Sequence, residues 1–324
     1  KRMLRLRRRS GSLVVAGHRE KRPVKLAVLL VALGTSALLL AACGSSSSSG
    51  SSEEKESAQS LSKFQQAVDK ALAVQSKWRG PTSGPVVEPG KRILNASCGE
   101  NAEGCVRITR GVTQAAEEVG WESKLVDTSG DPAALNSALL TDLKAQKWDG
   151  LAIAAVDPNL VQSAISEAQK QGIPIVSANY KSEPPIPKSI FASVTASNCE
   201  MGYAIGSAIV LQEKGQANVA VFRDSEFPGV EEEVNCIVKA IEECSGCSIV
   251  SDEDVKVTQL ATELPSLTTS VLSKNGSGVN VIATGYDAMA QFAVQGVRQS
   301  GRTDVSVTGY TGNSPNLKEM SNPD

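Results

Sequence analysis

The sequence predicts an α/β protein with two doubly wound parallel-sheet lobes joined by a hinge. From Lys91 onwards, short apolar segments alternate with longer amphipathic segments, as in successive βα units. The alternation runs through two consecutive sets of units, which predicts two lobes. Hydrophobic residues make up 41% of the 324 residues, enough to build a core in each lobe.

Residues 91–194 form the first predicted lobe. Its strand candidates are Arg92–Ser97, Ser123–Asp127, Gly150–Val156 and Ile173–Ala178, and the intervening helix candidates are Val106–Val119, Pro132–Gln146 and Pro158–Gln171. Asp131 and Asp157 each precede a proline and are predicted N-caps, since proline suits the first helical position. Gly172 ends the third helix.

Residues 195–310 form the second predicted lobe, and strand Ile190–Val194 precedes it. Residues 311–324 are predicted to return towards the first lobe. Helices are predicted over Asn198–Glu213, Gly229–Glu243, Thr258–Ser273 and Asp287–Ser300, and strands over Asn218–Phe222, Ser248–Val255, Val279–Thr284 and Val305–Tyr310. The hinge candidates are Ser193–Ala196 and Tyr310–Ser314.

Residues 1–42 have the pattern of an export signal. They hold ten Lys or Arg but one acidic residue, whereas the remainder is acidic. Leu26–Leu40 is an uncharged stretch of 15 residues, shorter than the roughly 20 needed to span a bilayer, and a basic stretch precedes it. A basic N-terminal segment followed by an acidic remainder favours export over nucleic-acid binding.

The segment Leu40-Ala41-Ala42-Cys43 resembles the lipobox of bacterial lipoproteins. In these proteins the cysteine sulfur receives a lipid and the chain is cleaved immediately before the cysteine. The alternative is a small-residue cleavage site with an incidental cysteine. Within the predicted 43–90 linker, a Ser-rich tether follows Cys43, residues 56–78 are predicted to form an amphipathic helix, and a Pro- and Gly-rich stretch completes it. The apolar members of that helix are Leu61, Phe64, Val68, Leu72 and Val74.

The histidine and cysteine content narrows the possible chemistry. His18 is the only histidine and lies in the predicted signal, which disfavours histidine-dependent nucleophilic catalysis and His-ligated metals. Six further cysteines allow 15 disulfide connectivities. We expect Cys98–Cys105 to close the first loop and the C-x-x-C pair Cys244–Cys247 to form a structural rather than a redox bridge, which leaves Cys199 to pair with Cys236. A zinc site would need cysteine ligands alone.

Several segments together resemble the type I periplasmic binding proteins of sugar transport, of the ribose-binding kind. The resemblance covers about Lys91–Met320 and is carried by GVTQAAEEVGW (111–121), DTSGDPAALNSALLTDLKAQKWDGLAIAAVDP (127–158), EAQKQGIPIVSAN (167–179) and YDAMAQFAVQGVRQSGRTDVSVTGYTG (286–312). It implies a small ligand bound between two lobes that close about a hinge. It also implies further chain after residue 324, so we expect a C-terminal truncation.

The candidate ligand-binding residues follow strand ends, where parallel sheets bind ligands. They are Asn101, Glu103, Asp157, Asn179, Tyr180, Phe227, Tyr286, Asp287 and Thr311. The alternative for Asp157 and Asp287 is helix capping, and for the 98–105 loop it is ordinary solvation. The resemblance implies a ligand-binding polar residue at Asn179.

The family pattern is not fully kept. Asn179-Tyr180 stands where ribose-type members commonly have Asp-Arg, Tyr286-Asp287 where they have Asn-Asp, and Thr311 where they have Asp; their second-lobe Arg falls near Glu233. The loss of these charged partners weakens the case for a pentose. A different sugar, a polyol or a small non-sugar metabolite remains open.

The sequence therefore predicts a monomeric, extracytoplasmic solute-binding protein, held to the bacterial membrane by lipid on Cys43, that delivers a carbohydrate or related solute to an ABC permease. The alternative is a sensor subunit that presents its ligand to a membrane receptor. We expect no enzyme activity, cofactor, metal or nucleic-acid partner.

Overall fold

The computed structural model describes residues 50–74, 77–78 and 80–321. The predicted signal sequence, the predicted lipidation site Cys43 and the start of the predicted Ser-rich tether lie outside these residues. Within the described part, no helix combines the length and apolar character needed to cross a membrane.

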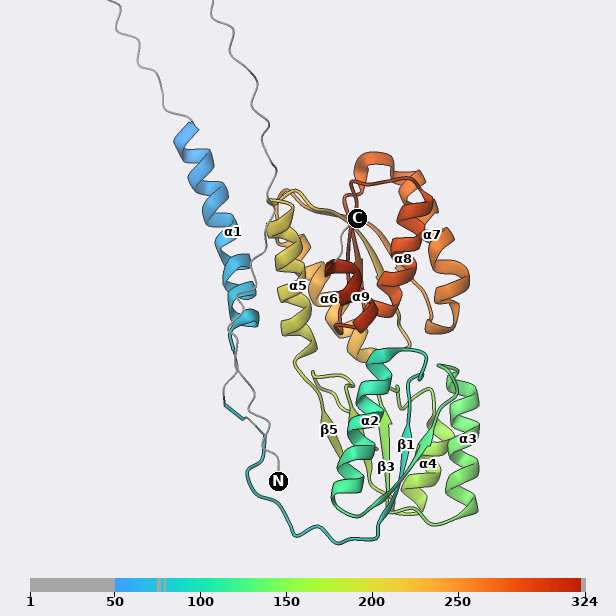
Figure 1. The fold of residues 1–324 in the computed structure, drawn as a ribbon. Helices are drawn as coiled ribbons and strands as arrows, with labels where there is room; N and C mark the ends of the chain where they lie inside the picture. Colours follow the sequence, from blue (N-terminus) through green and yellow to red (C-terminus); the bar gives the residue numbers. More distant parts are fainter. Residues whose placement is uncertain (1–49, 75–76, 79, 322–324) are drawn as a thin grey trace, which may run out of the picture. The chain divides into compact units, whose positions relative to one another are not determined.

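The first lobe is built on a five-stranded parallel sheet with strand order β2-β1-β3-β4-β5 (Figure 1). Its strands are β1 (Arg92–Ala96), β2 (Glu122–Val126), β3 (Gly150–Ala154), β4 (Ile175–Ala178) and β5 (Ala192–Val194), and its helices are α2 (Glu103–Glu118), α3 (Pro132–Ala145) and α4 (Gln162–Lys170). Buried side chains of β1 and β3, such as Leu94 and Ile153, pack with α3 and α4 in one core. The alternation of strand and helix is therefore confirmed.

The second lobe is built on a four-stranded parallel sheet with strand order β7-β6-β8-β9. Its strands are β6 (Asn218–Arg223), β7 (Ser248–Asp254), β8 (Val281–Thr284) and β9 (Ser306–Thr308), and its helices are α5 (Asn198–Gln212), α6 (Pro228–Glu242), α7 (Leu260–Asn275), α8 (Asp287–Gln299) and α9 (Ser314–Ser321), with short 3-10 turns at Val257–Gln259 and Gly276–Gly278.

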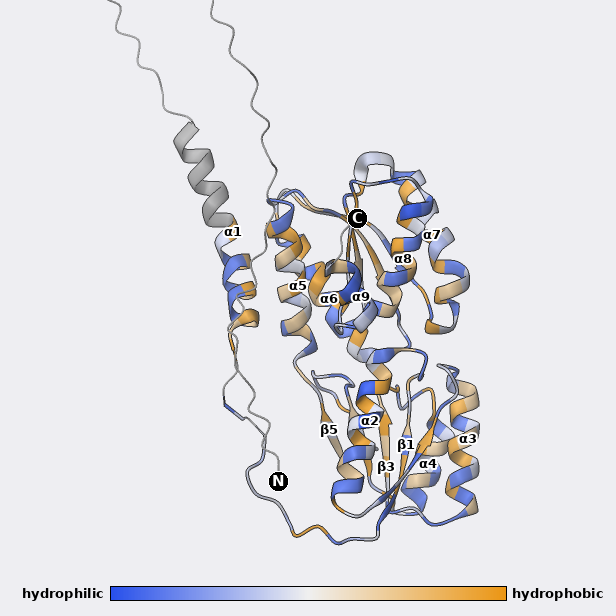
Figure 2. Cartoon of the chain, in the orientation of Figure 1, coloured by the Kyte–Doolittle hydropathy of each residue, from blue (hydrophilic) through white to orange (hydrophobic). Residues whose placement is uncertain are grey.

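The central strands of this second sheet are buried on both faces. Ala220, Phe222 and Ile282 pack with α7 and α8, whereas Val219 and Val221 pack with α5 and α6. Hydrophobic residues accordingly dominate the strands in Figure 2, while the helices carry both polar and apolar faces. A sheet covered on both faces is doubly wound, as predicted.

Helix α1 (Gly50–Leu72) begins and ends earlier than the predicted 56–78 helix. Phe64 is fully buried in the second-lobe core and Leu61 packs beside it, so α1 lies against α5. Lys63 and Lys70 add exposed ion pairs to Glu243 and Glu200, both at 2.9 Å. Leu72 and Val74, predicted to be part of the apolar face, are exposed because the helix ends at Leu72.

One of the two predicted aspartate N-caps is confirmed and the other is wrong. Asp131 accepts hydrogen bonds from the backbone N–H of Ala133 and of Ala134 at the start of α3. Asp157 instead accepts from the N–H of Asn159 at 2.9 Å, which closes a turn, and α4 begins only at Gln162. An aspartate that bonds two residues ahead favours a turn over immediate helix entry.

Three disulfides form as predicted: Cys98–Cys105, Cys199–Cys236 and Cys244–Cys247. The second joins α5 to α6, which approach closely because α5 carries glycines at the contact. A Cβ atom added at Gly202 would lie 2.0 Å from the carbonyl oxygen of Glu233, and one at Gly206 would lie 2.7 Å from that of Ile237. The helix pair therefore depends on the absence of side chains at both positions.

Candidate ligand-binding site

A pocket of about 510 Å³ lies where the carboxyl ends of strands from both sheets meet. First-lobe residues after β1, β3 and β4 contribute one side of it, and second-lobe residues after β6, β8 and β9 contribute the other. The pocket lining comprises Cys98, Ala102, Gly104, Cys105, Arg107, Ile108, Ala155, Ala178, Asn179, Val194, Thr195, Ala196, Phe227, Val230, Val257, Tyr286, Ala288, Tyr310, Thr311 and Asn313. A ligand held there would contact both lobes at once.

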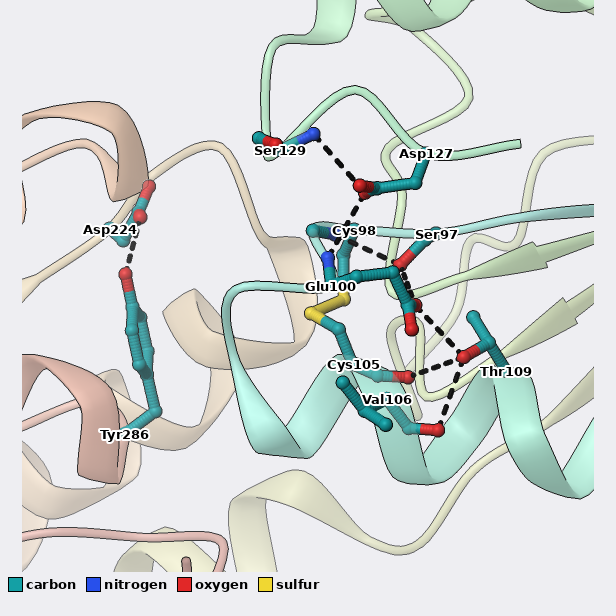
Figure 3. The surroundings of a disulfide bond; sticks show 11 residues. Ser97, Cys98, Glu100, Cys105, Val106, Thr109, Asp127, Ser129, Asp224 and Tyr286 are labelled. Atoms are coloured by element: carbon teal, nitrogen blue, oxygen red, sulfur yellow. Dashed lines mark hydrogen bonds between the residues drawn. A yellow bond between two sulfur atoms is a disulfide. The ribbon is translucent and has the colours of Figure 1, made fainter. Parts of the chain in front are cut away.

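The Cys98–Cys105 disulfide forms part of the first-lobe wall (Figure 3). Glu100 lies within the loop that the disulfide closes and connects it to neighbouring residues. Its carboxylate accepts hydrogen bonds from the Ser97 hydroxyl at 2.6 Å and from the Thr109 hydroxyl at 2.9 Å. Asp127 then accepts from the backbone N–H of Glu100 at 3.0 Å. These bonds give the loop a defined shape before any ligand arrives.

An aromatic pair forms part of the second-lobe wall. Phe227 and Tyr286 meet edge to face, with ring centroids 6.1 Å apart and an interplanar angle of 84°. The Tyr286 hydroxyl donates to the buried carboxylate of Asp224 at 2.8 Å, as Figure 3 shows. Burial raises the pKa of Asp224 to about 7, although the bond from Tyr286 stabilises its charged form. The hydrogen bond to buried Asp224 therefore fixes the position of the Tyr286 ring in the pocket wall.

Helix α2 of the first lobe is bonded to the segment that follows β9. The Arg107 guanidinium donates to the carbonyl oxygens of Thr311 and Gly312 and to Oδ1 of Asn313. Glu103 accepts from the backbone N–H of Ser314 at 2.8 Å and from its hydroxyl at 2.9 Å. These hydrogen bonds lower the pKa of Glu103. One predicted hinge segment is thus connected to both lobes.

The other crossing, after β5, is organised by Glu232 of α6. Its carboxylate accepts from the backbone N–H of Ser182 at 2.7 Å and from Nδ2 of Asn198 at 2.8 Å. Burial alone would raise the pKa of Glu232, but the bonds from Ser182, Asn198 and Glu183 outweigh it and lower the pKa. A first-lobe loop and two second-lobe helices therefore share one carboxylate.

Three non-glycine residues that line the pocket have left-handed backbone conformations. They are Ala155 with φ 53°, Asn179 with φ 54° and Thr311 with φ 100°. Asparagine tolerates this region, but alanine and threonine adopt it at a cost of about 1 kcal/mol or more. Such residues cluster at ligand sites because the surrounding structure holds the strained backbone in place.

Four of the predicted ligand-binding residues line the pocket: Asn179, Phe227, Tyr286 and Thr311. The other five lie elsewhere. Asn101 is exposed in the disulfide loop, Glu103 binds Ser314, Asp157 borders a separate cavity of about 20 Å³, Tyr180 is buried with its carbonyl oxygen bonded to Asn198, and Asp287 accepts from the backbone N–H of Asn313.

Sequence reasoning missed Arg107, and it named Tyr310 and Asn313 only as part of a hinge candidate, although all three line the pocket. Arg107 lies one helical turn after Glu103, so the face of α2 that points towards the hinge could have been inferred from that spacing. Tyr310 and Asn313 flank Thr311 closely enough to have been included with it. Within the described residues, no cluster of three or more His, Cys, Asp or Glu is placed to hold a metal ion.

Several solved structures have a similar fold, and three of them are described as transporter subunits or solute-binding proteins. An ABC sugar transporter subunit from Rhodobacter sphaeroides is 19% identical with a TM-score of 0.64, over 72% of this chain and 83% of that one. An ABC transporter solute-binding protein from Agrobacterium vitis, with bound allitol, is 20% identical with a TM-score of 0.63, over 72% and 80%. The 5-methylthioribose transporter solute-binding protein of Thermotoga lettingae is 18% identical with a TM-score of 0.62, over 72% of both chains.

A search of curated proteins finds no match. Residues 99–324, however, match the family described as "Periplasmic binding protein domain", which covers more than half of the chain, the whole second sheet and the first sheet except β1. The two parallel sheets, the pocket at their strand ends and this match agree. The chain therefore belongs to the periplasmic binding protein domain family and has its type I, ribose-binding-protein-like fold.

Proposed function

We propose that this protein captures a small solute between its two lobes and delivers it to an ABC permease. The observation that carries the proposal is the pocket of about 510 Å³, which takes its lining from both lobes and from the segments that connect them. A ligand that touches both lobes favours their closed arrangement, because it binds that arrangement more tightly than an open one. A permease can then distinguish ligand-bound from ligand-free protein, because the two lobes are closed in one and open in the other.

The proposal includes attachment to the extracytoplasmic side of the membrane through Cys43. The supporting observation is the order of sequence features, namely a basic stretch, an apolar stretch, small residues, cysteine and a serine tract. A single acyl chain binds a bilayer only marginally, whereas a diacylglyceryl group holds it stably. Such attachment would keep the binding protein close to its permease.

Solute capture is tested by thermal unfolding of the full chain against monosaccharides, polyols and small aromatic compounds. A true ligand at 100 times its Kd should stabilise the folded state by about 2.7 kcal/mol and raise the Tm. Replacing pocket-lining Ile108 by Trp should reduce the shift, because the larger side chain occupies part of the pocket. Val86→Trp is the matched control, because Val86 is 95% exposed in the linker. If no solute raises the Tm of the unmodified protein, the proposed function is wrong.

Membrane attachment is tested by expressing the full chain and its Cys43→Ala variant in a bacterium and separating the membrane and soluble fractions. We expect the unmodified protein in the membrane fraction, with an N-terminal peptide whose mass includes a diacylglyceryl cysteine. The variant should lose both the lipid mass and the membrane attachment. Equal membrane association of the two forms would contradict the anchor.

A further inference from the structure

Most polar side chains of the pocket are already bonded within the protein. The hydroxyl of Tyr286 donates to Asp224 and that of Tyr310 to the sulfur of Met201 at 3.4 Å. Thr311 donates to Oδ1 of Asn313 at 3.0 Å, and Thr195 bonds backbone carbonyl oxygens. A ligand that competed for these groups would first have to break existing hydrogen bonds.

The charged groups near the pocket are also occupied. Arg107 is the one charged side chain among the described pocket-lining residues, and its guanidinium bonds the carbonyl oxygens after β9 and lies 3.7 Å from Glu103. Among the described residues no carboxylate lines the pocket, since Glu103 and Asp287 bond the segment after β9 instead. The pocket therefore has one cation, which already bonds protein oxygens, and no carboxylate to accept from adjacent hydroxyls.

Two amide groups remain available. The side-chain amide of Asn179 has no hydrogen-bond partner in the described part of the chain, and neither does Nδ2 of Asn313, whose Oδ1 is occupied. The rest of the lining is apolar or aromatic and includes Ile108, Val194, Phe227, Val230 and Val257. The pocket thus offers a broad apolar surface with one or two polar contacts.

This arrangement discriminates between classes of solute. A monosaccharide or polyol carries hydroxyls around its whole ring, and each one buried without a partner would weaken binding roughly ten-fold or more. An aromatic or aliphatic ring gains affinity from each apolar atom removed from water. It also suits the edge-to-face pair of Phe227 and Tyr286.

We infer that the pocket selects an uncharged compound with an aromatic or aliphatic ring body and only one or two hydrogen-bonding groups, in preference to a polyhydroxylated sugar. The inference rests on the proposed function, because it names the class of solute that the same pocket captures. The ring body packs against Phe227, and the polar group bonds the side-chain amide of Asn179.

Isothermal titration calorimetry of the full chain tests the inference with three probes: 2-naphthol, D-glucose and myo-inositol. We expect 2-naphthol to bind at least about ten-fold more tightly than either polyol. Phe227→Ala should weaken 2-naphthol binding about ten-fold, whereas Phe191→Ala should leave it unchanged, because Phe191 is 79% exposed outside the pocket.

Asn179→Gly is the second variant, because glycine keeps the left-handed backbone with φ 54° while removing the amide. It should weaken 2-naphthol binding about two- to ten-fold, the worth of one hydrogen bond. Circular dichroism of each variant confirms that it is folded.

The possible outcomes separate the solute class from the function. Tight binding of glucose or inositol with little binding of 2-naphthol would overturn the inferred class and leave solute capture intact. Binding of 2-naphthol that neither Phe227→Ala nor Asn179→Gly changes would place it elsewhere and also overturn the class. Absence of binding by these probes and by every solute of the thermal-shift panel would overturn both proposals.

Discussion

Replacing Gly202 by Ala should destabilise the second lobe by more than about 3 kcal/mol, although the change adds a single methyl group. The added Cβ would lie 2.0 Å from the backbone carbonyl oxygen of Glu233, so α5 and α6 would have to move apart. The Cys199–Cys236 disulfide joins the same two helices one turn away and opposes that movement. Overpacking of a core commonly costs about 1–3 kcal/mol, and here the clash is with backbone that cannot rotate away.

Urea unfolding with the disulfides intact measures this effect. Gly111→Ala is the matched control, since it makes the same chemical change within α2 where nothing lies within 4 Å of the new methyl group. The control should stabilise its helix by about 0.5–1 kcal/mol. Equal stability of Gly202→Ala and the unmodified protein would show that the helices separate without cost.

Replacing Glu233 by Gln should stabilise the protein relative to the unmodified form, and this difference should grow as the pH rises. Glu233 is 1% exposed, and its Oε1 has no hydrogen-bond partner within the described residues. Burial, followed by the charge of Asp287, raises its pKa to about 9. The unfolded carboxyl releases its proton near its ordinary pKa of 4.5, whereas the folded one keeps it, so each pH unit in between costs the folded state about 1.4 kcal/mol.

The sign of the effect is therefore fixed. The folded state requires Glu233 to be protonated. The stability of the folded state is therefore unaffected by Glu233 below the unfolded pKa of this group and falls as the pH rises towards about 9. Glutamine resembles the protonated form and does not titrate. From about pH 5 to about pH 8 the stability of Glu233→Gln should rise by about 4 kcal/mol relative to the unmodified protein.

Urea unfolding at a series of pH values tests this difference. Asp224, with a pKa raised to about 7, adds a similar loss to both proteins and cancels in the comparison. Glu242→Gln is the control, because Glu242 lies on the same helix but is exposed. Parallel stability curves for Glu233→Gln and the unmodified protein would mean that Glu233 is solvated or bonded in solution.

The fold was largely predictable because it depends on local patterns. Strand and helix alternation, the Asp131 cap and the cysteine pairs each follow from residues near one another in the sequence or from elimination. The prediction for Asp157 was wrong because an N-cap and an aspartate turn have the same sequence pattern, and only the backbone after Pro158 separates them. The end of α1 was misplaced for a related reason, since apolar residues continue past Leu72 without a neighbour to cover them.

The pocket was less predictable than the fold. Its place at the strand ends follows from parallel-sheet topology, and Asn179 and Tyr286 were found in this way. Which side chains point into it depends on contacts between distant segments. Arg107 bonds the segment around Thr311, which lies about two hundred residues away in the sequence, and no local pattern reports that pairing.

Helix α1 determines where a mechanical load on the N-terminal chain would act. Phe64 is buried in the core of the second lobe, whereas the next element along the chain, β1, belongs to the first lobe. A pull on α1 from its N-terminal end therefore reaches the second lobe first, through the contact of α1 with α5. The lobe that carries Tyr286 would therefore bear such a load before the first lobe does.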